Sequence, residues 1–331
     1  MTALRWGVLG VSQLVGRLAV LPALRATSTG QLVAIGSREA ARAEAEAQLF
    51  DARRSYGSYE EVLADPNVDA VYIPLPNALH REWTLRAAKA GKHVLCEKPL
   101  ACTAKEAREM ASACRKAGVI LMEAQMSLFH RRYQQALAMA REGHLGQLRF
   151  IHANFTFPAG DPENYRWRPE LGGGSLLDVG GYCLTPILEL AVRPPRRLAA
   201  TAIMAESGVD SSFAGWLDFG GLAATFMVSF EAPEAQVLEL TGTRARLRIE
   251  RAFTAGREDK EIKLEYADGK LETVYSSAND PYLAMVEHFA AVVNGEVPAR
   301  VPTEHSIGVL SLIDRLRQSA RIEPVATARY D

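Results

Sequence analysis

His93-Val94-Leu95-Cys96-Glu97-Lys98-Pro99 is a short apolar run that ends in a charged pair and a proline. Such a run is typical of a strand buried inside a parallel sheet. Ligands of these sheets bind beyond the carboxyl ends of the strands, so Lys98 is expected where a side chain can act on a ligand. Glu97 can hydrogen-bond a ribose or orient the ammonium group. Pro99 can hold the bond before it in the cis form.

Short apolar segments alternate with helices on both sides of this run. The expected strands are residues 4–9, 32–35, 70–73, 93–96 and 119–123, and the expected helices are residues 13–26, 38–50, 79–90 and 103–116. This alternation predicts βαβ units with right-handed crossovers. We therefore expect an α/β fold whose N-terminal part is a Rossmann domain with a doubly wound parallel sheet.

The pattern changes after residue 123. A helix is expected at residues 130–141, strands at 147–157, 197–206, 213–219, 222–231, 236–241, 244–250 and 261–266, and two closing helices at 282–293 and 303–320. Turn signals such as Phe219-Gly220-Gly221 join the strands into an antiparallel meander. We expect a dinucleotide-binding domain at residues 1–123. Residues 124–331 should form a substrate-binding α+β domain with an open, mostly antiparallel sheet.

The composition is that of a soluble globular protein. Of the 331 residues, 48% are hydrophobic and 23% charged, and the net charge of −1 removes the broad attraction expected of a nucleic-acid binder. No apolar run is long enough to span a bilayer, and the N-terminus leaves no room for a signal peptide. The four cysteines and seven histidines lack metal-binding or disulfide spacing, so we expect a cytoplasmic protein with no metal site.

Gly7-Val8-Leu9-Gly10-Val11-Ser12-Gln13-Leu14-Val15 forms the expected first turn from strand to helix. The dinucleotide fingerprint Gly-x-Gly-x-x-Gly/Ala brings the backbone close to a pyrophosphate at the helix N-terminus. Gly10 fits its first position, Ser12 replaces the second glycine, and Val15 replaces the third. A strand–helix turn of any α/β protein is the alternative reading. The residues expected to contact the cofactor here are Gly10, Ser12, Gln13 and Leu14.

The end of the second strand discriminates between cofactors. An acidic residue there binds the ribose 2′-hydroxyl of NAD, whereas arginine offers a two-pronged contact to a 2′-phosphate. The strand ends in Gly36-Ser37-Arg38, which favours NADP. Glu39 follows directly and is the competing candidate for NAD. In the alternative without a cofactor, Ser37 is a helix N-cap and Arg38 is solvated.

The third long strand is followed by Pro74-Leu75-Pro76-Asn77 and then by His80. Because this loop leaves the carboxyl end of a parallel strand, we expect Pro74, Leu75, Asn77 and His80 at the cofactor, together with Glu97 and Lys98. Two structural alternatives remain open. Asn77 can be the N-cap of the next helix, and His80 can cap that helix instead of touching the nicotinamide ribose.

Gly172-Gly173-Gly174-Ser175-Leu176-Leu177-Asp178-Val179-Gly180-Gly181-Tyr182 is the second unusual segment. Three glycines let the backbone pass close to another group, and Ser175 is expected to cap a helix. Asp178 and Tyr182 stand four residues apart, so they share one face of that helix. In the purely structural alternative, Asp178 makes a hydrogen bond and Tyr182 belongs to the core.

These segments together resemble the Gfo/Idh/MocA family of glucose–fructose oxidoreductase, inositol dehydrogenase and rhizopine-catabolism proteins. The resemblance covers essentially the whole chain and implies a Rossmann domain followed by a domain whose sheet often makes oligomer contacts. Tyr182 stands where many members have histidine, which is similar to the branch of glucose–fructose oxidoreductase, dimeric dihydrodiol dehydrogenase and NADP-linked xylose dehydrogenase. Gln125-Met126-Ser127-Leu128 departs from the aromatic and arginine run that members often carry after Glu-Ala.

The resemblance implies hydride transfer between NADP, or alternatively NAD, and a hydroxyl-bearing carbon of a sugar, polyol or cyclic diol. Tyr182 is expected as the acid/base, since a nearby ammonium lowers the pKa of a phenol. Lys98 would supply that charge and bind the reacting oxygen, and Asp178 would bind a neighbouring hydroxyl. Phe155, Tyr165 and Arg166 are expected in the substrate pocket. The alternatives are an NAD-linked inositol or sugar dehydrogenase and a non-catalytic nucleotide sensor on the same fold.

Overall fold

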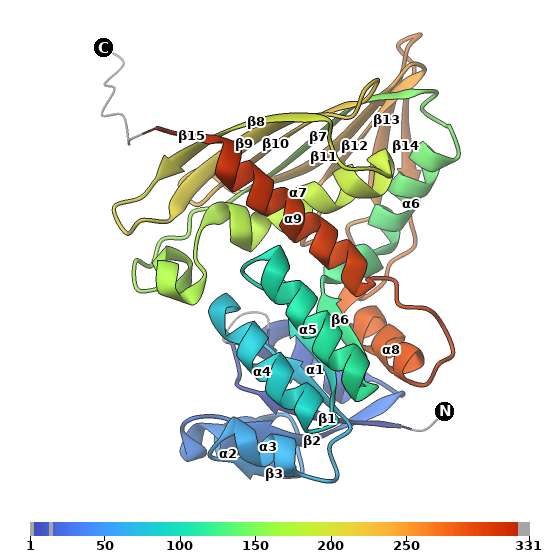
Figure 1. The fold of residues 1–331 in the computed structure, drawn as a ribbon. Coiled ribbons are helices and arrows are strands. Elements are labelled where there is room, and N and C mark those ends of the chain that lie inside the picture. The colour runs from blue at the N-terminus through green and yellow to red at the C-terminus, as the bar shows by residue number, and fades with distance from the viewer. Residues whose placement is uncertain (1–2, 13–15, 324–331) are drawn as a thin grey trace. The chain divides into compact units, whose positions relative to one another are not determined.

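The computed structural model describes residues 3–12 and 16–323, and the chain divides into two compact units. Met1–Phe129 and Asp280–Ile307 form the first unit, and His130–Asn279 and Gly308–Asp331 form the second (Figure 1). Each unit has its own sheet. Among the described residues, no helix is long and apolar enough to cross a membrane.

The first unit contains a six-stranded sheet in the order β3-β2-β1-β4-β5-β6, and every pair of neighbours is parallel. The strands are β1 (Leu4–Leu9), β2 (Gly30–Gly36), β3 (Arg54–Tyr56), β4 (Ala70–Ile73), β5 (His93–Glu97) and β6 (Leu121–Ala124). The order reverses between β1 and β4, and such a switch point is where doubly wound sheets bind ligands. The predicted Rossmann architecture is confirmed.

Helices cover this sheet because its strands are apolar on both sides. They are α1 (Leu21–Ala26), α2 (Ala40–Leu49), α3 (Tyr59–Ala64), α4 (Asn77–Lys89), α5 (Ala104–Ala117) and α8 (Pro281–Val293). The last of these comes from the far end of the chain. Its Phe289 packs on the fully buried Trp6 of β1 with ring centroids 5.1 Å apart. Residues 280–307 thereby complete the core of the first unit.

The second unit contains a nine-stranded sheet in the order β14-β13-β12-β11-β7-β10-β9-β8-β15. The strands are β7 (Leu148–Thr156), β8 (Arg197–Met204), β9 (Asp210–Asp218), β10 (Ala223–Ser229), β11 (Ala235–Gly242), β12 (Ala245–Glu250), β13 (Glu261–Tyr266), β14 (Leu271–Tyr275) and β15 (Ala320–Glu323). Most pairs are antiparallel, as expected. The meander is interrupted because β7 pairs with β10 in parallel.

Helix α7 (Ser175–Ala191) lies along one face of this sheet against β7, β9 and β10 (Figure 1). Helix α6 (Arg131–Arg141) also belongs to this unit, and α9 (Thr303–Ser319) precedes the last strand. Twelve α7 residues are buried, including Asp178 and Tyr182. The opposite face of the sheet keeps exposed apolar side chains on β7, β9 and β10.

Several local predictions differ from the structure. The expected helix at 13–26 is replaced by a π-helical turn, Gly16–Val20, followed by the short helix α1, while residues 13–15 lie outside the described part. β3, α3, β14 and β15 were not expected, and β15 rather than a helix is the last described element. The missed strands, β3, β14 and β15, lie at sheet edges, where apolar alternation is weak.

Candidate active site

The turn after β1 is built for a close approach of the backbone. Gly10 has φ +86°, and a Cβ there would lie 2.9 Å from Leu75 Cδ2 and 3.1 Å from the Tyr59 hydroxyl. Ser12 Oγ accepts the backbone N–H of Gly16 at 2.8 Å, so its hydroxyl closes the turn. Gln13 and Leu14 lie outside the described residues.

Two arginines meet a tyrosine beside this turn. Arg38, after β2, donates to the hydroxyl of Tyr59, and Arg42 Nη2 donates to the carbonyl of Val11 at 2.8 Å. Burial raises the pKa of Tyr59, while the charges of Arg38 and Arg42 act against this shift. The structure thus places positive charge next to Gly10, as an anionic cofactor requires.

Ser37 and Asn77, the alternative helix caps of this region, do not cap their helices. Ser37 is buried, and its hydroxyl accepts the N–H of Glu39 at 3.2 Å, but the N-cap of α2 is Glu39. Similarly, Pro76 precedes α4 and Asn77 is its first residue, so Asn77 is not the cap. Neither side chain is therefore committed to capping its helix.

His80 connects two loops at the carboxyl edge of the sheet. The ring is fully buried, with Nδ1 2.9 Å from the Pro99 carbonyl and Nε2 2.7 Å from the Leu75 carbonyl. Burial lowers the pKa of His80 and outweighs the opposite effect of these two carbonyl groups. The loop at Pro74–Asn77 and the turn after β5 are thus held by one side chain.

The turn that contains Lys98 is also held by side chains of two neighbouring strands. The Lys98–Pro99 bond is cis. Tyr72 donates to Glu97 Oε1 at 2.6 Å, and burial raises the pKa of Glu97 to about 7. Glu123 accepts the N–H of Leu100 at 2.9 Å, immediately beyond the proline. The backbone around Lys98 is therefore fixed by buried groups on the neighbouring strands β4 and β6.

These features fit a bound dinucleotide. The first glycine of a dinucleotide site makes a tight turn after the first strand, and Gly10 makes this turn with a positive φ. The ribose-phosphate end of the dinucleotide needs donors near the end of β2, where Ser37, Arg38 and Arg42 stand. The strand order reverses between β1 and β4, which is where doubly wound sheets bind their ligands.

In the second unit, Asp178 is held by two residues that were expected in the substrate pocket. Arg166 Nε lies 2.6 Å from Asp178 Oδ2, and the Tyr165 hydroxyl lies 3.4 Å from Oδ1. Burial lowers the pKa of Arg166, but the charge and hydrogen bond of Asp178, together with Tyr165 and Tyr182, outweigh it, so the net shift is upward. The guanidinium also lies 5.5 Å from the ring centre of Phe157. The side chains of Arg166 and Asp178 are 16% and 1% exposed, so the ion pair is largely shielded from water.

Tyr182 lies one turn after Asp178 in an aromatic cluster. Its ring is 5.4 Å from Phe155 and 5.9 Å from Phe253, measured between ring centroids. Phe155 is itself stacked on Phe253 at 6.0 Å. The structure therefore brings Phe155 and Tyr182 together, and it brings Tyr165 and Arg166 to Asp178. Phe155, Tyr182 and Phe253 are all at most 7% exposed, so this cluster also belongs to the core of the second unit, as the structural alternative for Tyr182 predicted.

Four residues that hold this site were missed at the sequence level: Tyr72, Arg42, Glu123 and Asp210. Asp210 replaces the cap expected from Ser175, because Gly174 is the N-cap of α7 and Ser175 Oγ donates to Asp210 Oδ2 at 2.8 Å. No local pattern marks Tyr72, Glu123 or Asp210, since each acts on a residue distant in sequence. Only the spacing of Arg42 on the helix after Arg38 was a usable signal.

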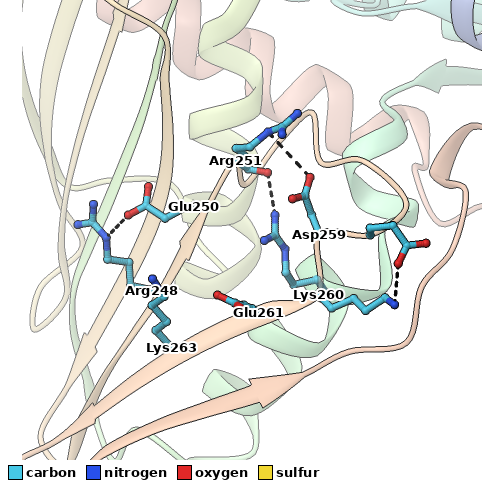
Figure 2. A pocket seen from close by; sticks show the side chains of 9 residues that line it. Arg248, Glu250, Arg251, Asp259, Lys260, Glu261 and Lys263 are labelled. Atoms are coloured by element: carbon cyan, nitrogen blue, oxygen red, sulfur yellow. Dashed lines mark hydrogen bonds and ion pairs between the residues drawn. The ribbon is translucent and has the colours of Figure 1, made fainter.

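One cavity of the second unit lies at the end of β12 and β13 (Figure 2). Its charges largely pair with one another, as in Arg248–Glu250 at 2.7 Å and Lys260–Glu258 at 2.8 Å. None of the predicted site residues lines it. Within the described ranges, no group of three or more His, Cys, Asp or Glu side chains could hold a metal ion.

Comparison with known proteins decides the family. Residues 4–125 match the oxidoreductase family with an NAD-binding Rossmann fold, and residues 133–248 match the GFO/IDH/MocA C-terminal domain. The chain belongs to this family. The predicted Gfo/Idh/MocA membership and oxidoreductase class are confirmed.

Individual members of the family match three quarters of the chain or more. A D-xylose 1-dehydrogenase (NADP⁺) from Haloferax volcanii is 40% identical over 95% of this chain and 97% of its own. A trans-1,2-dihydrobenzene-1,2-diol dehydrogenase from Mus musculus is 33% identical over 76% of each. A 3-ketoreductase from Actinomadura kijaniata, solved in complex with NADP and TDP-benzene, has a TM-score of 0.91 at 31% identity and covers 98% of this chain and 100% of that one.

Proposed function

We propose that the protein is an NADP-preferring dehydrogenase or reductase that acts on a CH–OH group of a sugar, polyol or cyclic diol. The preference for NADP rests on the positive charge that follows β2. Arg38 and Arg42 both act on Tyr59, whose hydroxyl lies beside Gly10. The relatives named for D-xylose and dihydrodiols support the substrate class.

The first unit is proposed to bind the dinucleotide, and the division of roles at residues 1–123 and 124–331 stays a prediction. The contacts proposed for the cofactor lie in the turn after β1, at the end of β2, after β4 and at the end of β5. They are Gly10, Ser12, Gln13, Leu14, Ser37, Arg38, Pro74, Leu75, Asn77, His80, Glu97 and Lys98. When bound, the nicotinamide supplies hydride acceptance or donation.

The chain's own residues would transfer the proton and bind the reacting oxygen. During oxidation, the Tyr182 phenolate takes the hydroxyl proton while the C–H bond gives up its hydride, so the alcohol becomes a carbonyl. The Lys98 ammonium binds the reacting oxygen and offsets its developing negative charge. Asp178, with Arg166, orients a neighbouring hydroxyl, and Phe155 and Tyr165 complete the substrate contacts. Reduction uses the same groups in reverse, with the Tyr182 phenol as the proton donor.

Structures of the Actinomadura kijaniata 3-ketoreductase include variants with one tyrosine or one lysine replaced. These are the two residue types proposed here for proton transfer and for binding the reacting oxygen. The proposal is tested by assaying the full chain with NADP and with NAD against aldoses, polyols and cyclic diols. Turnover of a substrate should fall roughly hundredfold or more in Tyr182→Phe, with cofactor affinity unchanged. Tyr275→Phe, at an exposed position on β14, is the control. Unchanged turnover in Tyr182→Phe would remove Tyr182 from the mechanism.

A homo-oligomer formed through the nine-stranded sheet is also proposed. Phe150, Trp216 and Met227 are exposed, and the register of β7, β10 and β9 puts them on one face. The opposite face is covered by α7. An apolar sheet face of this kind suits a second copy of the chain in the cytoplasm.

A further inference from the structure

Helix α7 carries both of the side chains proposed for chemistry in the second unit. Asp178 stands in its first turn and Tyr182 in its second. Because an α-helix is a stiff rod with a rise of about 1.5 Å per residue, a shift at its first residue moves Tyr182 with it. The position of Tyr182 therefore depends on what holds the start of α7.

The start of α7 has no cap of its own. The N-cap is Gly174, with φ +109°, and it provides no side-chain hydrogen bond to the N-terminal N–H groups. These groups need an acceptor when a helix begins in a buried place. Ser175 and Leu176 are fully buried, so water cannot serve as that acceptor.

Asp210, the first residue of β9, supplies the acceptor from another element. Its Oδ2 accepts the N–H of Leu176 at 2.6 Å and the hydroxyl of Ser175 at 2.8 Å. A Cβ at Gly174 would come within 2.5 Å of Asp210 Oδ1, so the backbone rests directly against the carboxyl group. Only glycine allows this contact at the observed φ.

The carboxyl group is well shielded. Asp210 is 8% exposed, and burial raises its pKa, against the hydrogen bonds from Leu176 and Ser175 and the charge of Arg317. A buried acceptor shared by two donors defines both the axial position and the rotation of the helix. Reaction rates fall steeply when a reacting group moves by about 1 Å.

We propose that Asp210 is a positioning residue for the reaction, because its carboxyl group fixes the start of α7 and thereby the placement of Tyr182 and Asp178. The inference rests on the proposed role of Tyr182. It assigns to Asp210 no contact with substrate or cofactor.

The test compares Asp210→Ala, Asp210→Asn and Asp218→Ala in the full chain. Asparagine keeps both hydrogen bonds, because its amide oxygen can take the place of Oδ2 and accept from both the Leu176 N–H and the Ser175 hydroxyl. Asp218 ends the same strand and accepts the Gly220 N–H at 2.7 Å, away from α7, so it is the matched control. We expect kcat to fall roughly tenfold to hundredfold in Asp210→Ala, with KM for NADP unchanged. Asp210→Asn should restore kcat to within about threefold of the wild type.

Assays well below each variant's unfolding temperature separate positioning from stability. A kcat of Asp210→Ala within twofold of the wild type, or an Asp210→Asn enzyme as slow as Asp210→Ala, overturns the proposal. If Asp210→Ala does not fold, Ser175→Ala removes one of the two hydrogen bonds and should lower kcat by a smaller factor; an unchanged kcat there also overturns it.

The outcome for Tyr182→Phe keeps the two proposals distinguishable. Loss of turnover in Tyr182→Phe together with normal turnover in Asp210→Ala refutes only the role of Asp210. Normal turnover in Tyr182→Phe refutes the proposed mechanism, whatever Asp210→Ala does.

Discussion

The Arg166 guanidinium and the Asp178 carboxylate form an ion pair at 2.6 Å, with side-chain exposures of 16% and 1%. Removing one member of such a buried pair leaves an uncompensated charge. Arg166→Gln should therefore lower the free energy of unfolding by about 3–5 kcal/mol and also lower kcat. Urea unfolding measures the first effect and steady-state kinetics the second.

The matched control for this variant is Arg168→Gln. Arg168 Nε lies 2.8 Å from Glu170 Oε1, but both side chains are at least half exposed. Solvent screens such pairs, so Arg168→Gln should change stability little. Equal destabilisation in the two variants would show that the Arg166–Asp178 pair has no special structural importance.

Glu97 should make folding stability depend on pH. Its pKa is raised by burial from the ordinary 4.5 to about 7, so the folded state holds the proton more tightly than the unfolded chain. The resulting stabilisation is fully present below pH 4.5 and is lost as the pH rises to about 7. The loss amounts to about 3 kcal/mol.

Glu97→Gln should remove this fall, giving a flatter profile of unfolding free energy from urea titrations across the same window. Tyr72→Phe should extend the loss of stability to higher pH, because the Tyr72 hydrogen bond lowers the pKa of Glu97. Glu82→Gln, on the exposed face of α4, is the control. Parallel profiles for the wild type and Glu97→Gln would contradict this prediction.

Arg38 should set the preference for NADP over NAD. Charge-assisted hydrogen bonds contribute about 1.5–3 kcal/mol each, so Arg38→Ala should weaken NADPH binding roughly tenfold to hundredfold. NADH binding should stay nearly constant, since NADH lacks the 2′-phosphate. Fluorescence titration with both nucleotides measures the ratio. The rival NAD reading predicts instead that Glu39→Gln weakens NADH binding and that Arg38→Ala changes neither.

Trp216→Glu should disrupt the proposed oligomer. Trp216 is 39% exposed on the sheet face opposite α7, in register with Thr225 of β10. A buried unpaired carboxylate at an apolar interface strongly opposes association. Light scattering coupled to gel filtration should show a smaller particle than the wild type. Exposed Leu18, in the first unit, provides the control variant Leu18→Glu, and a mass unchanged by Trp216→Glu would exclude this face.

Patterns of neighbouring residues predicted most of the fold. β1, β4 and β13 have the expected bounds, because β1 and β4 are short apolar runs and β13 alternates apolar with charged residues. The turn at Gly10 and the placement of Asp178 and Tyr182 on one helix also follow from local spacing. The glycine fingerprint was less decisive. Its third position falls on Val15, but the turn is closed by the N–H of Gly16, which donates to the Ser12 hydroxyl.

The supports of the site could not be predicted, because they join residues far apart in the chain. Asp210 caps a helix that starts 35 residues earlier. Glu123 binds Leu100 on one side and the Ser306 hydroxyl, at 2.6 Å, on the other, 183 residues away. A single sequence contains no periodicity that links such positions. Their roles become visible only when the strands are placed side by side.

The packing of Phe289 on Trp6 also has a consequence for biosynthesis. A nascent chain that has not yet emerged as far as Phe289 leaves an indole uncovered on the central strand of its first sheet. The strand that carries Trp6 thus waits for a much later segment of the chain before its interior is closed. During that interval the exposed ring is a natural target for chaperones.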